Sequence, residues 1–291
     1  MNTNTYYEIG SSHKVCEDYA LSGIYKDMAY AIISDGCSAS DDTDIGARLL
    51  STIAKGVIKY LRDRNLIGTK DFNSIFRELV VRKCLEVKQS LGIPIEAFDA
   101  TLLISTVYQD KIISLGWGDG YFIFVTKDNV KIIYDIHYSM GAPYYLSYEM
   151  SPSKKQAYMD TYGNTILTIK NSIIATNGSV TETTTTPTGG LYSESLYKEA
   201  HAPSINFVIL SSDGIGTYQD DPKFSKEDGT EKKSYNAVEI IPKIAAYKNT
   251  AGEFVVRRML RIKSDMDRSH IIHIDDVSCA SIALDIEPSK E

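Results

Sequence analysis

Two apolar segments of this chain each end in an Asp-Gly pair. The first is "AIISDGCSAS", which ends at Ser40, and the second is "FVILSSDGIG", which ends at Gly216. Both have the pattern of buried strands, and a carboxylate beside a core strand is costly to bury unless it is paired or binds a cation. Asp-Gly also ends strands as ordinary turn chemistry, which remains open for each pair taken alone. Together the two endings favour a fold whose core strands carry carboxylates to one edge.

Helical periodicity appears in two pairs of segments. Apolar residues recur every three or four positions in residues 41–65, after the acidic cluster of Asp41, Asp42 and Asp44, which suits a first helical turn. A second helix is predicted from about Phe72 to Leu91. Two more are predicted in residues 234–248 and 251–265.

Short β-branched and aromatic segments lie between these helices. Residues 19–34 are predicted to form two strands, and residues 100–136 four strands of an antiparallel meander. Core strands are also predicted at residues 205–214 and at the closing segment "DDVSCASIALDI". The pattern weakens over residues 140–203, where 181–190 is predicted to be a surface loop. We expect a single α+β domain over residues 1–291, with helices outside a β core.

Composition excludes several classes of protein. The net charge of −7 argues against nucleic-acid binding, and no apolar run approaches the roughly 18 residues that span a membrane. The first ten residues lack the features of a signal peptide. The four cysteines form no C-x-x-C pair and fit a reducing cytoplasm. We find no EF-hand, no P-loop lysine and no third ligand beside His270 and His273 for zinc.

Acidic residues adjoin most of the predicted core strands. They are Glu17-Asp18, Asp35, Asp119, Asp213 and Asp275-Asp276. Carboxylates that converge at one edge repel one another unless cations lie between them, and hard oxygen ligands suit Mg²⁺ or Mn²⁺. A glycine after the aspartate lets the backbone approach an ion closely.

The order of these motifs resembles the metal-dependent protein phosphatases of type 2C, the PPM family. The chain has "CEDYAL", "ISDGCS", "FDATLLIST … GWGDGYFIF", "VILSSDGI" and "DDVSCASIAL" in the family's order, from about Gly10 to Leu284. The segment "SSHKVCED" is most similar to a bacterial and phage subgroup with His in place of a phosphate-binding Arg. The resemblance implies two packed antiparallel β-sheets flanked by α-helices, with a two-metal site at one end.

The resemblance also implies roles for individual residues. Asp35 would bridge two Mn²⁺ or Mg²⁺ ions, and Gly36 would offer its carbonyl to one of them. Asp213 and Asp275 would ligate the other ion, and Asp276 would point away, since adjacent residues point apart in a strand. Asp18 would orient the attacking water with support from Glu17.

Four positions depart from the family pattern. His13, followed by Lys14, stands at the Arg position and could donate a hydrogen bond to phosphate, although an ordinary surface His is an equal alternative. Cys37 stands where some members have a His proposed as general acid. A third metal, with Asp119 as a ligand, would be weak, because Thr217 replaces an acid and Asp220 and Asp221 are out of register. Asp99 is expected to be a structural turn residue.

The resulting hypothesis is a serine/threonine phosphoprotein phosphatase that acts as a cytoplasmic monomer. The alternative is a catalytically inactive regulatory module that binds phosphoproteins or a partner. A phosphatase of small phosphoesters is a third possibility. Retention of Asp18, Asp35, Asp213 and Asp275 favours an enzyme.

Overall fold

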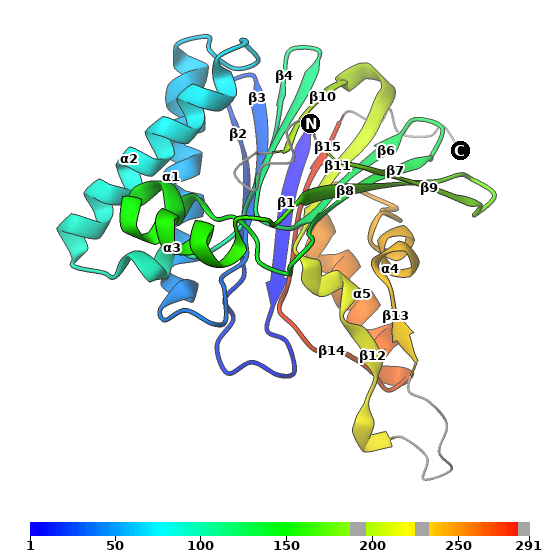
Figure 1. Cartoon of the computed structure of the whole chain (residues 1–291). Coiled ribbons are helices and arrows are strands. Elements are labelled where there is room, and N and C mark those ends of the chain that lie inside the picture. The colour runs from blue at the N-terminus through cyan, green and yellow to red at the C-terminus, as the bar shows by residue number, and fades with distance from the viewer. Residues whose placement is uncertain (187–195, 225–232, 285–291) are drawn as a thin grey trace.

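The computed structural model describes residues 1–186, 196–224 and 233–284, and in that part of the chain two large antiparallel sheets pack face to face. The seven-stranded sheet has the order β1-β15-β11-β6-β7-β8-β9, and the five-stranded sheet has the order β10-β5-β4-β3-β2. A small third sheet has the order β13-β12-β14. Figure 1 shows α1 and α2 outside the five-stranded sheet, and α4 and α5 outside the seven-stranded sheet. The predicted α+β sandwich is therefore confirmed.

The strands of the seven-stranded sheet are β1 Asn2–Glu8, β6 Gly120–Thr126, β7 Lys131–Tyr138, β8 Leu167–Ile174, β9 Val180–Thr185, β11 Ile205–Ser211 and β15 Val277–Ala283. Those of the five-stranded sheet are β2 Tyr19–Tyr25, β3 Met28–Ser34, β4 Leu102–Tyr108, β5 Lys111–Trp117 and β10 Leu196–His201. The small sheet consists of β12 Tyr218–Asp220, β13 Ser234–Tyr235 and β14 Ile271–His273. The α-helices are α1 Thr43–Asp63, α2 Phe72–Leu91, α3 Pro152–Tyr162, α4 Ala237–Ile244 and α5 Phe254–Arg268.

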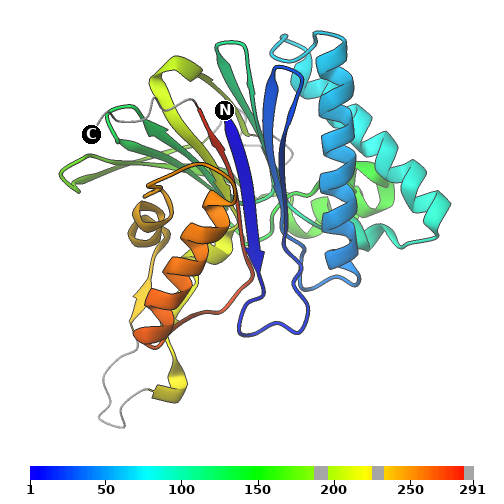
Figure 2. The same ribbon diagram turned by 180° about the vertical axis from the view of Figure 1, so that it is seen from behind.

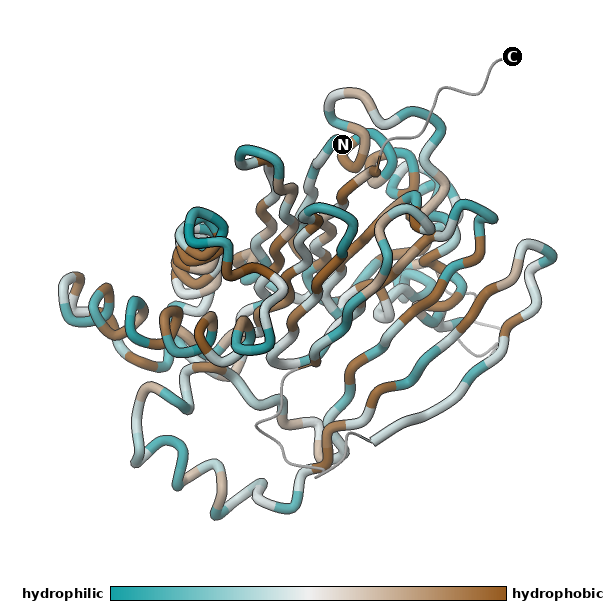
Figure 3. Tube along the Cα trace, turned by 90° about the horizontal axis from the view of Figure 1, so that it is seen from above, coloured by the Kyte–Doolittle hydropathy of each residue, from teal (hydrophilic) through white to brown (hydrophobic). Residues whose placement is uncertain are grey.

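Three apolar clusters hold the four layers together. The central cluster lies between the sheets and includes Ile33, Leu103 and Leu210. A second cluster packs α1 and α2 on the five-stranded sheet, and a third packs α4 and α5 on the seven-stranded sheet. Figure 3 shows hydrophobic segments along the strands and hydrophilic segments at the turns between them. Every residue of β3 and β4 is buried. Their sheet is covered on both faces, so side chains on both sides of each strand are mostly apolar.

The predicted meander over residues 100–136 is wrong in its pairing, although its four strands are present. β4 and β5 pair in one sheet and β6 and β7 pair in the other, so the chain crosses between sheets after Trp117. The crossing uses Gly118 and Gly120, whose φ angles are +85° and +123° and therefore favour glycine. Asp119 lies between them, at the boundary of the two sheets.

Several elements differ from the sequence predictions. The expected loop at 181–190 is β9 as far as Thr185, because an edge strand needs only one partner and β-branched Thr suits a strand; residues 187–190 lie outside the described residues. β1, β8, β10, α3 and the small sheet were not predicted. α4 is shorter than predicted, because Asn236 caps it. Within the described residues no helix has the length and apolar character needed to cross a membrane.

Candidate metal centre

Five aspartates gather at one edge of the two sheets because of how their strands pair. β2 and β3 pair with Tyr19 opposite Ser34, so Asp18 before β2 and Asp35 after β3 are neighbours. Across the sandwich, Ser211 at the end of β11 pairs with Cys279 of β15 and with Tyr121 of β6. The same edge therefore carries three further carboxylates, from Asp119, Asp213 and Asp275.

The electrostatics of these side chains show how closely they converge. Burial raises the pKa of Asp35 well above its usual range, and the charges of Asp18, Asp213, Asp119 and Asp275 raise it further. Burial likewise raises the pKa of Asp119 to about 7, with Asp213 as the next cause. The pKa of Asp213 is raised by burial and then by Asp275. Carboxylates from both sheets thus share one buried, electronegative space.

Asp18 is the most enclosed member of the group, since the residue is only 1% exposed. One of its carboxylate oxygens accepts a 2.7 Å hydrogen bond from the Ser212 hydroxyl, while Oδ1 has no hydrogen-bond partner among the described residues. The Ser212 hydroxyl in turn accepts from the Ser278 amide at 2.9 Å. Burial raises the pKa of Asp18 to about 7. A buried oxygen without a donor is costly, and a cation would satisfy it.

Backbone contacts fix the chain at Asp35 and Gly36. The Asp35 amide donates to the Thr101 hydroxyl at 2.9 Å, and its carbonyl accepts from the Thr101 amide at 2.8 Å. The Gly36 amide donates to the Glu17 carbonyl at 3.2 Å. A Cβ on Gly36 would lie 2.8 Å from the Cβ of Thr43, so only glycine fits between this segment and the start of α1.

Asp275 and Asp276 differ sharply in environment. Both Asp276 oxygens accept backbone hydrogen bonds, from the Gly10 amide at 2.7 Å and the Glu17 amide at 2.6 Å, and its side chain is 2% exposed. The Asp275 side chain is 37% exposed, and one of its oxygens accepts from the Asp276 amide at 2.8 Å. Asp276 therefore ties the N-terminal loop to the start of β15, whereas Asp275 faces the carboxylate group.

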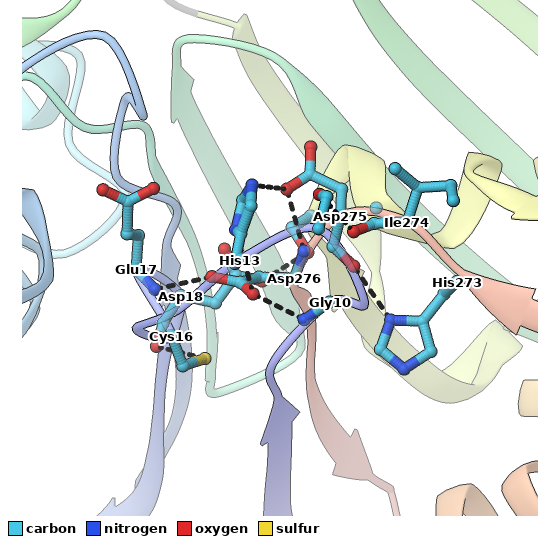
Figure 4. Close-up of polar contacts among 12 residues, drawn as sticks. Gly10, His13, Cys16, Glu17, Asp18, His273, Ile274, Asp275 and Asp276 are labelled. Carbon is cyan, nitrogen blue, oxygen red and sulfur yellow. Dashed lines mark hydrogen bonds and ion pairs between the residues drawn. The ribbon is translucent and has the colours of Figure 1, made fainter.

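His13 lies between these two carboxylates, as Figure 4 shows. Its Nε2 is 3.4 Å from Asp275 Oδ1, and its Nδ1 is 3.1 Å from Asp276 Oδ1. The expectation that only Asp275 faces the site stays a prediction, although one imidazole reaches both carboxylates because both residues precede β15. Burial lowers the pKa of His13, but contact with Asp276 and then Asp275 outweighs it and raises the pKa overall.

Glu17 and Thr217 make contacts that complete the loops around the carboxylates. The Glu17 carboxylate accepts from the Thr43 hydroxyl at 2.7 Å, and in Figure 4 it lies apart from those of Asp275 and Asp276. The Thr217 hydroxyl donates to the Gly214 carbonyl at 2.8 Å and accepts from the Asp275 amide at 3.2 Å. Thr217 thus supports the backbone at a position where the resemblance implies an acid for a third metal.

Asp99 forms a buried network beside the site. Its carboxylate accepts from the hydroxyls of Ser147 at 2.5 Å and Ser40 at 2.9 Å, and it forms a 2.7 Å ion pair with Lys154. Its carbonyl accepts from the Cys37 amide at 2.8 Å. Asp99 therefore connects the loop after Asp35 to α3, which is more than the turn role expected from sequence.

The donor set fits hard divalent cations. After burial, the largest causes that raise the pKa of Asp35 are the charges of four carboxylates. The described residues contain no group of three or more His, Cys, Asp or Glu side chains already arranged to hold a metal ion. Buried carboxylates that repel one another, together with the unpartnered Asp18 oxygen, are nevertheless the environment that Mg²⁺ or Mn²⁺ would stabilise.

Three supporting residues escaped the sequence analysis. Ser212 binds Asp18, Thr101 binds Asp35, and the Gly10 amide binds Asp276. A Cβ on Gly10 would lie 2.3 Å from the Asp275 carbonyl carbon, so glycine is required there too. Only the position of Ser212, directly before the second Asp-Gly pair, was a sequence indication of such a role.

Comparison with known proteins agrees with this geometry. Residues 9–136 match the model of the family described as protein phosphatase 2C. The match covers less than half of the chain, so it shows what this part of the sequence is similar to. The matched range contains Asp18, Asp35 and Asp119, whereas Asp213 and Asp275 lie beyond it. No curated protein matches the sequence.

Solved structures share the fold of this chain over nearly its whole length. The serine/threonine phosphatase Stp1 from Staphylococcus aureus aligns with 12% identity over 98% of this chain and 96% of its own, with a TM-score of 0.54. A bacterial serine phosphatase aligns with 12% identity over 99% of both chains, also with a TM-score of 0.54. At these identities the likeness concerns the fold alone.

Proposed function

We propose that this chain is a metal-dependent phosphatase that hydrolyses phosphoserine and phosphothreonine in proteins. The observation that carries the proposal is the convergence of carboxylates from both sheets at one edge, where the charges of Asp18, Asp119, Asp213 and Asp275 raise the pKa of Asp35. Such a site attracts cations and, without them, repels a phosphate dianion. The match of residues 9–136 to the protein phosphatase 2C family supports the same reaction.

The proposed ligands come from both sheets. Asp35 and the Gly36 carbonyl come from the five-stranded sheet, and Asp213 and Asp275 from the seven-stranded sheet. When bound, two Mn²⁺ or Mg²⁺ ions supply a lowered pKa for water and positive charge for the phosphoryl oxygens. Asp119 is a candidate ligand for a third ion, which Thr217 would leave weakly held.

The remaining roles follow from contacts within the chain. Asp18 is proposed to orient the attacking water through its unpartnered Oδ1, since Ser212 occupies the other oxygen. Glu17 supports this loop through Thr43 and through its backbone contact with Asp276. His13 is proposed to contact phosphate from beside Asp275, with its ring orientation fixed by Asp276.

The substrate class, the location and the oligomeric state are proposed from more general observations. Phosphoprotein substrates follow from the family, and a cytoplasmic location is consistent with the cysteines Cys16, Cys37, Cys84 and Cys279, which are all free. We also propose a monomer.

The test is hydrolysis of a phosphothreonine peptide with Mn²⁺, with EDTA, and by the Asp35→Asn variant. We expect turnover with Mn²⁺ alone, and loss of turnover in the other two conditions. Asp128→Asn is the matched control, because Asp128 is an exposed turn residue beyond the opposite end of β6 from Asp119, the proposed ligand nearest to it in sequence. A well-folded protein that shows no turnover with Mn²⁺ would contradict the proposal and favour an inactive binding module.

A further inference from the structure

A basic cavity of about 370 Å³ lies at the junction of α4 and α5. Its lining includes Lys248, Arg257, Arg258 and Arg261, with Asp265 as the single acidic residue. Figure 2 shows α4 beside the first turns of α5, while the last turn of α5 leads to β14. The described lining residues on α5 run from Phe254 at its start to Asp265 in its last turn, and they include none of the proposed metal ligands.

Backbone carbonyls hold two of the guanidinium groups in place. Arg257 donates to the carbonyls of Ala251 at 2.8 Å and Asn249 at 3.4 Å. Arg258 donates through Nε to the Lys243 carbonyl. Because these bonds use only part of each five-donor fork, the remaining N–H groups are available while the side chain stays oriented.

No acidic side chain in the described residues forms an ion pair with Arg257, Arg258 or Lys248. Asp265, the only carboxylate in the lining, already contacts Arg261 at 3.6 Å and also pairs with Arg268. Although the chain has a net charge of −7, Asp265 is the single carboxylate among the described lining residues, against the four cations Lys248, Arg257, Arg258 and Arg261. The cavity thus concentrates positive charge on a protein that is negative overall.

Burial makes this arrangement costly without a ligand. Arg258 is half-buried, and desolvation lowers the pKa of its guanidinium below its usual range. A partly desolvated cation without an acidic partner gains the most from an anion that enters the cavity. The carbonyl contacts already orient the arginine side chains. Binding of an anion would therefore cost less side-chain conformational entropy.

We propose that this cavity binds a phosphate monoester group, separately from the carboxylate site. Two oriented guanidinium groups match the oxygens of a tetrahedral dianion with bidentate hydrogen bonds, and Lys248 adds a point charge. A cavity of this size accommodates a phosphorylated side chain or a small phosphate ester. A phosphoprotein held here by one phosphate would remain near the carboxylate site for hydrolysis of another.

The test is calorimetric titration of the whole chain in EDTA, where the carboxylate site repels phosphate. The probes are inorganic phosphate, a phosphoserine peptide and AMP, with sodium chloride at matched ionic strength as the blank. We expect saturable binding that weakens by about tenfold or more when Arg257→Gln and Arg258→Gln are combined, which is the size of a lost charged hydrogen bond. The tightest probe identifies the source: peptide, nucleotide or free phosphate.

The control is Arg82→Gln combined with Lys83→Gln, two exposed cations on α2 on the opposite side of the molecule. If the double variant at Arg258 fails to fold, Arg257→Gln alone serves, because Arg257 is exposed. No saturable binding of any probe, or equal affinity in the control and cavity variants, would overturn the proposal. The outcome is independent of phosphatase activity, because no turnover is measured.

Discussion

Asp18 combines deep burial with an oxygen that has no donor, and this gives the metal-free protein an unusual pH dependence. Its pKa is raised to about 7, whereas an unfolded Asp titrates near 4 at roughly its usual value. The folded state therefore binds more protons than the unfolded state between these two pH values, and stability falls as pH rises through that window. Asp119, with a pKa of about 7, acts in the same direction.

We therefore expect the EDTA-treated protein to have a higher Tm at pH 5 than at pH 7.5. Asp18→Asn removes a buried charge, so it should raise the Tm at pH 7.5, flatten the pH dependence, and abolish turnover. Differential scanning calorimetry at the two pH values measures the first two effects. A Tm for Asp18→Asn at pH 7.5 below that of the wild type would show that the carboxylate is stabilising and contradict the argument.

Asp99 differs from Asp18 because its buried charge is compensated. Lys154, which is 14% exposed, pairs with it, and two serine hydroxyls complete its hydrogen bonds. Asp99→Ala should reduce the free energy of unfolding by about 3 kcal/mol, because the nearest carboxylate left to Lys154 is the exposed Glu96, 3.8 Å away. Urea denaturation measures the loss.

The matched control for Asp99 is Asp160→Ala, an exposed residue of α3 that contacts Gln156. It should change stability by less than about 0.5 kcal/mol. Adding Lys154→Met to Asp99→Ala should recover part of the loss, since it removes the uncompensated charge. A double variant no more stable than Asp99→Ala would mean that lost packing, not charge, dominates.

At the scale of a single element, α1 shows how closely the helices are fitted around the site. A Cβ on Gly46 would lie 1.5 Å from the Ala97 carbonyl oxygen, so the first turns of α1 touch the short 3₁₀ helix Ile95–Phe98. Gly56 lies about three helical turns further on, and a Cβ there would meet nothing within 4 Å. The same substitution in one helix should therefore have opposite effects.

Gly46→Ala should destabilise the protein by several kcal/mol, because overpacking against backbone cannot be relieved by a rotamer change. Gly56→Ala should stabilise it by about 0.5–1 kcal/mol, because alanine is the better helix former. Thermal unfolding of the two variants measures both. Equal effects of the same sign would show that helix propensity, not the contact with Ala97, governs this face of α1.

The helices and core strands could be predicted because their signals are local. α2 has the predicted bounds, since its periodicity and Gly92 stop are contained within its own sequence. β1 and β9 could not be predicted, because their sequences, "NTNTYYE" and "VTETTT", form strands only by pairing with β15 and β8. The sheet crossing at Asp119 was missed for the same reason.

The candidate site likewise contains residues that could be predicted from the sequence and residues that could not. Each aspartate could be predicted from the apolar strand beside it. Ser212 and Gly10 could not, because their partners Asp18 and Asp276 lie 194 and 266 residues away along the chain. Sequence also could not distinguish the environments of Asp275 and Asp276, which depend on the backbone amides of the N-terminal loop.

For the molecule as a whole, the proposed cations would connect the two sheets. Asp18 and Asp35 belong to the five-stranded sheet and Asp213 and Asp275 to the other, so opening the sandwich at this edge would release the ions. Ligands that bind only the folded state stabilise it by about 2.7 kcal/mol at a hundredfold excess over Kd. Mn²⁺ at such an excess should therefore raise the Tm by several degrees.

This increase in Tm should arise from Mn²⁺ bound at Asp35, not from a change in ionic strength. Potassium chloride at equal ionic strength should leave the Tm almost unchanged, and Asp35→Asn should lose the Mn²⁺ shift while Asp128→Asn retains it. The shift should also be larger at pH 7.5 than at pH 5, because Mn²⁺ must displace protons from the carboxylates whose pKa values burial has raised. A Mn²⁺ shift of the same size in Asp35→Asn would place the cations elsewhere on the molecule.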